Sequence, residues 1–281
     1  MKSILLSLVL FPVFITAQIS YNTDDQFSLF NASSFSNQKI YSTVLAGNSN
    51  LNNLDYFSVF ILHKQKVKAF SIGINSEFTR FKPFLLSKSE IQIGYPYQIN
   101  RKFMLNSGLG LSVQTDNYLS TSSWNPAYFG LNPGISLVSK KGQVGLSFIN
   151  ITGANRTIDS LKFRVQTYAS IFASYDFKLD TTGNLHFIPS LYFEFGPFGF
   201  NNSLVNIKFK ALNNSLGVSY SIYHPAVFYQ HQLKNGVTVG VSVGKYWSPL
   251  NSSFDKSWNG MVRLNYSFKR KGCKFTGTPS F

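Results

Sequence analysis

The sequence predicts an all-β protein, a transmembrane antiparallel β-barrel of about 14 strands, and three observations support this fold class. Segments of about ten residues alternate between apolar and polar side chains. Phenylalanine and tyrosine number 28 and 15, whereas only 13% of the 281 residues are charged. Turn-forming residues separate the alternating segments. Such a chain can present apolar side chains to lipid on one face of its sheet and polar side chains to a lumen on the other.

The N-terminus has the order of a secretory signal. Lys2 precedes an apolar run over residues 4–14, and Ala17 ends a small-residue cleavage site before Gln18. The run is too short for a membrane-spanning helix, which needs about 20 apolar residues, although an uncleaved anchor is the alternative. We therefore predict a cleavable signal peptide at residues 1–17 and an exported mature chain without membrane helices.

The alternation is clearest in residues 237–244, where four valines share one face and Thr, Gly and Ser occupy the other. Residues 103–114 place Leu and Val opposite Asn, Gly and Ser in the same way. In residues 185–195 the inward set is His186, Ser190, Tyr192 and Glu194, while Pro189 removes one ladder hydrogen bond. Further strands are predicted at residues 40–45, 91–99, 216–222 and 262–268.

Short basic turns alternate with longer polar connections. Outer-membrane barrels have short periplasmic turns and long external loops, so we expect an outer-membrane protein whose two chain termini both lie in the periplasm. The predicted short turns are residues 64–66, 100–102, 140–142, 180–184 and 234–236, and the longer gaps are residues 75–88, 115–127, 152–162 and 247–256.

The predicted barrel spans residues 39–268. Residues 18–38 form an irregular periplasmic or plug segment, and residues 269–281 form a basic periplasmic tail. A soluble β-sandwich is the alternative fold, but it predicts charged residues spread along a solvent-facing side of each sheet. Here the charges gather in the turns instead, which favours the barrel.

No motif for catalysis or metal binding stands out in the sequence. The four histidines, at positions 63, 186, 224 and 231, lack the spacing of a zinc site, and no nucleophile elbow or phosphate loop is present. We therefore expect no enzyme activity, no cofactor and no metal. His186 or His231 acting as a base on lipid is the alternative, and a hydrogen-bonded histidine is the simpler interpretation.

Basic residues concentrate in the predicted periplasmic turns and the tail, and the net charge is +15. A basic rim suits docking of an acidic protein partner, whereas ordinary solvated turns are the alternative. Nucleic acid is not an expected partner, because the chain is exported and carries no nucleic-acid motif. The candidate docking residues are Lys64, Lys66, Arg101, Lys102, Lys140, Lys141 and Lys234, with Lys269, Arg270, Lys271 and Lys274 of the tail.

Several short segments carry a family resemblance. Residues 26–31 read Gln-Phe-Ser-Leu-Phe-Asn, and residues 145–150 read Gly-Leu-Ser-Phe-Ile-Asn. Together with residues 45–48, 93–99, 188–191 and 278–281, they are similar to the PorP/SprF membrane proteins of the type IX secretion system, which also serves gliding motility. The chain departs from the family pattern at Ala32, where a proline is expected, and its last four residues lack the family's arginine.

The resemblance implies an outer-membrane barrel that acts with periplasmic secretion-system or peptidoglycan-binding proteins, or with a surface adhesin, and has no cofactor. Our main hypothesis is a component of the secretion and gliding apparatus that anchors or assists export of a surface protein. The alternative is a diffusion channel or small-solute transporter, which the polar lumen-facing side chains suggest.

Overall fold

The computed structural model describes residues 33, 40–51, 54–67, 69–81, 84–118, 127–153, 155–158, 161–164, 167–196, 199–221, 225–233, 236–245 and 258–268. The predicted signal peptide, the basic tail and all of residues 18–38 except Ser33 lie outside this part of the chain. The first strands are β1 (Ile40–Leu51), β2 (Leu54–Val67), β3 (Phe70–Phe81), β4 (Phe84–Gln98), β5 (Phe103–Tyr118), β6 (Tyr128–Ser139) and β7 (Gly142–Ile149).

After a small separate hairpin of β8 (Asn155–Ile158) and β9 (Leu161–Arg164), the chain returns to the main sheet. The described part of the chain contains no helix long and apolar enough to span a membrane. The remaining strands are β10 (Tyr168–Tyr175), β11 (Phe177–Lys178), β12 (Leu185–Gly196), β13 (Gly199–Ala211), β14 (Asn214–Ser221), β15 (Pro225–Gln232), β16 (Val237–Lys245) and β17 (Trp258–Phe268).

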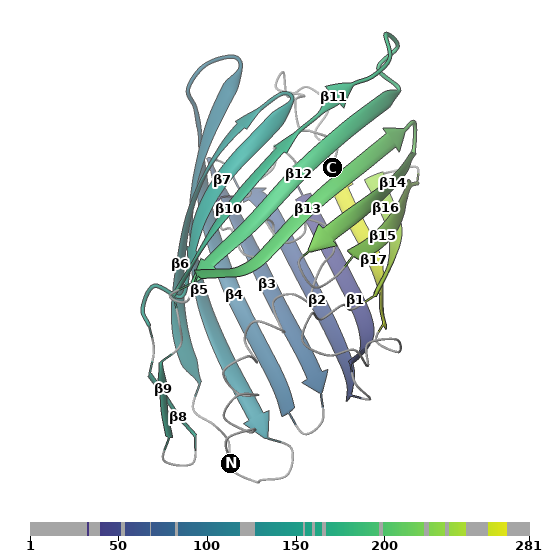
Figure 1. Cartoon of the computed structure of the whole chain (residues 1–281). Coiled ribbons are helices and arrows are strands. Elements are labelled where there is room, and N and C mark those ends of the chain that lie inside the picture. The colour runs from purple at the N-terminus through teal and green to yellow at the C-terminus, as the bar shows by residue number, and fades with distance from the viewer. Residues whose placement is uncertain are drawn as a thin grey trace.

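The main sheet closes into an antiparallel barrel (Figure 1). Neighbouring strands are consecutive in the chain, β1 pairs with β17, and β10 pairs with β12 across the connection that contains β11. Because the ring is closed, each of its strands has a neighbouring strand on both sides. The described wall therefore exposes no sheet edge to lipid. The prediction of a barrel with about 14 strands is confirmed, since β11 continues β10 and does not add a separate strand.

Pro189 explains why β10 and β11 are two short strands. Both pair with β12 in one continuous register, with Ser174 opposite Ser190 and Phe177 opposite Phe187. The interruption between them falls opposite Pro189, which has no backbone N–H to donate. The predicted loss of a ladder hydrogen bond at this residue therefore fits the observed break.

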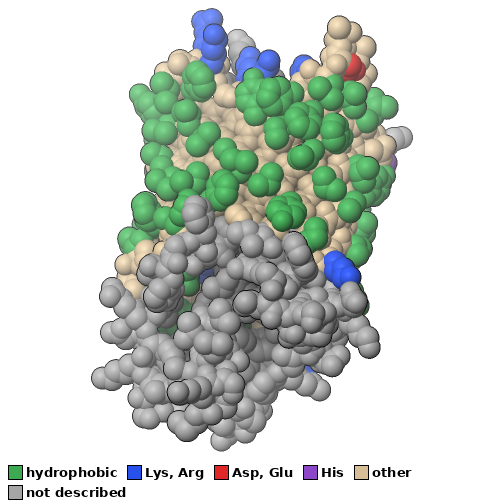
Figure 2. Space-filling view, viewed as in Figure 1, with side chains coloured by type: hydrophobic (Ala, Val, Ile, Leu, Met, Phe, Trp, Pro, Cys, Tyr) green, Lys and Arg blue, Asp and Glu red, His purple; other side chains and the backbone are tan. Residues whose placement is uncertain are grey.

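Side chains alternate between the two surfaces of the barrel wall. In β12, Ser190, Tyr192 and Glu194 are buried toward the lumen, while Leu191 is exposed on the outer surface. In β16, the valines at 239, 241 and 243 are exposed and Ser242 is buried. Figure 2 shows the resulting band of hydrophobic side chains on the face of the wall in view. The predicted inward and outward faces of these strands are confirmed.

Aromatic rings form a row on several strands close to one end of this band. The rings of Tyr175 and Phe177 have centroids 4.5 Å apart, and the rings of Phe187 and Phe209 have centroids 5.2 Å apart. Phe177 and Phe187 link the two pairs at 6.0 Å. Aromatic girdles of this kind mark the boundary between a membrane and water.

Two predicted connections are wrong. Residues 75–88 are not a long gap, because β3 and β4 pair through them and only residues 82–83 join the strands. Several of their polar side chains, such as Asn75 and Thr79, are buried on the inner face, and Glu77 pairs there with Lys88. The inner face of these strands therefore has the composition of a loop. Similarly, residues 64–66 belong to β2, whose turn comes only after Val67.

Candidate docking rim and lumen

One end of the barrel carries the basic turns. The β2–β3, β4–β5 and β6–β7 connections lie at this end, and so do the start of β1 and the end of β17, where Ile40 pairs with Phe268. Figure 2 shows Lys and Arg side chains gathered there, above the hydrophobic band. The exposed cations in or next to these three neighbouring connections, which we call the basic rim, are Lys66 near the end of β2 and Arg101, Lys102, Lys140 and Lys141 in the turns.

Polar side chains fix the two turns that carry most of the rim. Oδ1 of Asn100 accepts hydrogen bonds from the backbone N–H groups of Lys102 and Phe103, at 2.8 and 2.9 Å. In the β6–β7 turn, Oγ of Ser139 accepts from the N–H of Gly142 at 3.0 Å and donates to its carbonyl oxygen at 2.9 Å. These bonds hold the tips of both hairpins, so the basic side chains project from ordered backbone.

Lys64 is a correction to the predicted docking set. It lies within β2 and points into the lumen, where only 4% of its surface is exposed. Its side chain runs over Gly73 of the neighbouring strand, because a glycine there leaves room for it. The other predicted members, Lys234 and Lys269, Arg270 and Lys271 of the tail, lie outside the described residues.

The β10–β12 connection adds an ordered loop beside the basic rim. Asp180 accepts hydrogen bonds from the Thr182 hydroxyl and from the N–H groups of Asn184 and Leu185. The Thr182 hydroxyl, followed by the Leu185 amide, lowers the pKa of Asp180 from 3.8 to about 2. The carboxylate therefore stays charged and keeps the loop closed at all physiological pH values.

Both histidines considered as alternative bases have hydrogen-bond partners close to the strand ends. Nδ1 of His186 lies 2.7 Å from Oδ1 of Asp176, and its Nε2 lies 2.9 Å from the carbonyl oxygen of Gly183. Nδ1 of His231 lies 2.8 Å from Oδ1 of Asn214. Among the residues that the structure describes, no group of three or more His, Cys, Asp and Glu side chains could hold a metal ion.

The lumen wall carries a lateral network of buried polar groups. Oε1 of Glu90 accepts from Nε2 of Gln92 at 2.8 Å, and its Oε2 accepts from Nδ2 of Asn132 at 2.7 Å. Lys88 forms an ion pair with the same carboxylate at 3.5 Å. Glu90 on β4 and Asn132 on β6 meet across β5, whose Gly110 leaves space for them. The network fastens three consecutive strands to each other.

Asn150, the last residue of the family-like segment 145–150, extends this network to the end of β7. It adopts a left-handed conformation with φ of 61°. Its backbone N–H donates to Oδ1 of Asn132 at 2.6 Å, and its carbonyl oxygen accepts from the Thr167 hydroxyl at 3.0 Å. Asparagine tolerates this conformation better than most residues, so the motif ends in a residue that turns the chain out of the barrel.

Sequence reasoning missed several inward charges. Glu90 and Lys208 are both buried on the inner wall, whereas Glu194 is the inward carboxylate that the alternation predicts. Alternation around Lys208, between outward Ile207 and Phe209, was the signal that could have placed it. Glu90 closely follows residues 75–88, whose polar composition predicts a loop, so the sequence pattern does not place it on a strand face.

A closed antiparallel barrel with an apolar outer band, an aromatic row and a polar inner wall is an integral outer-membrane β-barrel protein. Residues 85–266 match the family described as type IX secretion system membrane protein PorP/SprF. The match covers more than half of the chain, so this protein belongs to the PorP/SprF family. The predicted family and the outer-membrane location are confirmed.

Solved structures of other outer-membrane barrels share the fold. They include the toluene transporter TbuX of Ralstonia pickettii, with 8% identity and a TM-score of 0.54 over 86% of this chain and 93% of that one. A FadL homologue of Pseudomonas aeruginosa is 7% identical, with a TM-score of 0.55 over 87% and 94% of the two chains. A deletion mutant of the monoaromatic hydrocarbon channel TodX is 7% identical, with a TM-score of 0.55 over 91% and 98%. No curated protein matches the sequence.

Proposed function

We propose that this protein anchors or assists the export of a surface protein in the type IX secretion and gliding apparatus, and that it docks an acidic periplasmic partner on its basic rim. The observation that carries the proposal is the arc of five exposed cations in or next to three neighbouring connections at one end of the barrel. Membership of the PorP/SprF family supports the secretion role.

The rim has the properties of a docking surface. Its turns are tied down by Asn100 and Ser139, so binding a partner orders little additional backbone. Exposed Lys and Arg side chains of one sign attract an acidic surface over about 8–10 Å at physiological ionic strength. The partner class that fits is an acidic periplasmic secretion-system or peptidoglycan-binding protein, or an adhesin passing through the apparatus. This role requires no reaction at the protein itself.

Charge reversal of the rim tests the proposal. The variant combines Arg101→Glu, Lys102→Glu, Lys140→Glu and Lys141→Glu, and it leaves Asn100 and Ser139 in place. Detergent-solubilised membranes are then used for affinity purification, and co-purified proteins are identified by mass spectrometry. We expect the wild type to retain secretion-system components or an adhesin, and the variant to lose them along with surface display of the cargo.

Arg80 and Lys245 provide a matched control, because both are exposed cations near the opposite end of the barrel. Arg80→Glu with Lys245→Glu should leave co-purification and surface display unchanged. Equal retention of partners by the rim variant and by the wild type contradicts the proposal. So does equal loss of partners in the control variant.

A diffusion channel is the second candidate function, and the polar inner wall favours it. Planar-bilayer recordings of the purified mature protein separate the two functions. Steady, solute-dependent conductance in the wild type supports a channel, whereas a silent barrel supports the secretion role.

A further inference from the structure

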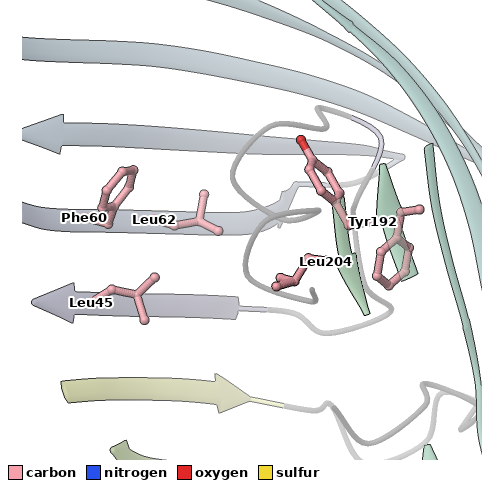
Figure 3. Packing of buried hydrophobic residues seen from close by; sticks show 6 residues of the cluster. Leu45, Phe60, Leu62, Tyr192 and Leu204 are labelled. Carbon is pink, nitrogen blue, oxygen red and sulfur yellow. The ribbon is translucent and has the colours of Figure 1, made fainter. Parts of the chain in front are cut away.

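His186 lies on the inner face of β12, close to the end of the barrel that carries the basic rim. The same face of this strand carries Tyr192, which packs in the buried apolar cluster shown in Figure 3. The side chain of His186 is 13% exposed, and that of its partner Asp176 is 11% exposed. Both groups are therefore largely shielded from water, and neither belongs to the proposed docking surface.

Both ring nitrogens of His186 face hydrogen-bond acceptors. Nε2 lies 2.9 Å from the carbonyl oxygen of Gly183, which has no hydrogen to donate. Nδ1 lies 2.7 Å from Oδ1 of Asp176, which is also an acceptor when the carboxyl group is ionised. A neutral imidazole carries a hydrogen on only one nitrogen, so it cannot donate to both partners. The pair therefore holds one proton more than a neutral ring and an ionised carboxylate would.

Charged groups on several neighbouring elements surround the ring. Lys178 of β11 and Lys210 of β13 pair with His186 from either side, and both oppose a positive charge on the ring. Asp180 is engaged by the backbone N–H groups of its own loop. Asp176 is therefore the anion that keeps the extra proton on the pair.

The pair connects the β10–β12 loop to the β6–β7 turn. Gly183 belongs to this loop, and its carbonyl oxygen contacts Nε2 of the ring. Asp176 follows β10, and its backbone N–H donates to the carbonyl oxygen of Lys141 in the β6–β7 turn. His186 lies between these two contacts. Because the turn carries Lys140 and Lys141 of the basic rim, the pair lies directly beside the docking surface.

We propose that His186 and Asp176 form a proton-dependent latch that fastens the β10–β12 loop to the β6–β7 turn. At lower pH the pair is protonated and both contacts of the ring are satisfied. As the pH rises the pair releases one proton to water, and the lone pair of Nδ1 then faces the carboxylate, so this contact opens. Asp180 keeps the loop itself folded throughout. A carboxylate released beside Lys140 and Lys141 weakens their attraction for an acidic partner, a consequence that rests on the proposed docking function.

Hydrogen exchange of the purified full-length protein in detergent, followed by NMR, tests the latch. Exchange of the Asp176 amide is compared at about pH 5 and about pH 8, the limits between which histidine changes its charge, after correction for the intrinsic pH dependence of exchange. We expect protection of this amide to be about tenfold or more lower at the higher pH, because hydrogen bonds to charged groups contribute on this scale.

Two variants and a control separate the latch from general effects of pH. His186→Gln and Asp176→Asn each remove the titrating pair, so protection of the amide at position 176 should no longer depend on pH. The two variants are independent, so misfolding of one leaves the other as a test. His231→Gln is the matched control, because His231 lies at the same end of the barrel and its ring contacts the neutral Asn214. It should keep the dependence seen in the wild type.

Equal protection of the wild-type amide at the two pH values overturns the proposal. So does loss of the pH dependence in the control variant, or its persistence in a folded variant that lacks the titrating pair. All of these measurements use the protein without a partner, so failure of the latch is distinguishable from failure of the docking proposal.

Discussion

Gly110 shows how closely polar side chains pack on the lumen wall. A Cβ atom at this position would collide with Oε1 of Glu90, and it would lie 2.9 Å from Cδ of Glu90 and 3.3 Å from Cβ of Asn132. The absence of a side chain is thus what lets Glu90 and Asn132 meet across β5. The hydrogen bond between Glu90 and Asn132 requires a glycine at position 110, whereas the backbone conformation there does not.

Gly110→Ala should therefore destabilise the barrel by about 1–3 kcal/mol, the usual cost of forcing extra volume into a packed site. Urea unfolding of the protein in lipid vesicles, followed by tryptophan fluorescence, measures the change. Gly260→Ala is the control, because a Cβ atom there meets only ordinary contacts at 3.6 Å or more. Equal midpoints for the Gly110 variant and the wild type would show that Glu90 can move away freely.

Asp180 gives a prediction about pH. Its folded-state pKa is depressed to about 2, so the order it gives the β10–β12 loop is present above about pH 4 and is lost as the pH falls through about 2. Thr182→Val removes the largest cause and should raise the pKa toward 3.8. NMR titration of the side-chain carboxyl carbon measures both midpoints. An unchanged midpoint in the variant would exclude the hydroxyl as the cause.

At the residue scale, the alternation of apolar and polar residues predicted which surface of the wall most side chains face, but not which residues they contact. Tyr192 and Glu194 point inward as expected. The Glu90–Asn132 bond joins residues 42 positions apart, and it depends on the register of three strands and on the gap at Gly110. Periodicity fixes the face of a strand, whereas register and neighbouring side-chain volume fix the contacts.

Strand β16 represents the lipid-facing elements. Its Val239, Val241 and Val243 are exposed on the outer surface, and Val241 pairs with Val262 of β17, which is also exposed. Such exposed apolar surface is stable only where lipid covers it. The strand therefore needs apolar residues at alternate positions through the depth of the membrane.

Val241→Arg should cost about 2–4 kcal/mol, because a cation on the lipid face is least tolerated near the middle of the bilayer. Leu216→Arg, close to the turn between β13 and β14, should cost only about 0–1 kcal/mol. Unfolding of both variants from vesicles measures the difference. Similar small costs at the two positions would contradict a lipid-facing β16.

The sequence predicted most of the strands, but it predicted the residues at which they begin and end less well. Polar lumen-facing residues in β3 and β4 have the same composition as a loop, which concealed the short connection at residues 82–83. Lys64 was placed in a turn for the same reason, although β2 continues to Val67. Pro189 was recognised in advance as a weak point of the ladder, and the break between β10 and β11 lies opposite it.

At the scale of the whole molecule, ring closure determines where the charges lie. Pairing of β1 with β17 places the start of β1 and the end of β17 at the end of the barrel that carries the basic turns. The sequence alone predicted this arrangement, because short basic turns alternate with longer connections along the chain. In an antiparallel barrel, alternate connections lie at the same end. The hydrogen bond from Ser136 to the carbonyl oxygen of Ser33 could not be predicted in the same way, since it joins residues more than 100 positions apart in the chain.

The most direct test of the docking role uses a photo-reactive amino acid in living cells. It is placed at Lys102 on the basic rim in one strain and at Arg80 near the opposite end in another, both exposed positions. We predict that Lys102 forms adducts with an acidic periplasmic component of the secretion apparatus or with its cargo, and that Arg80 does not. Absence of adducts at Lys102, or the same adduct at both positions, would contradict the account.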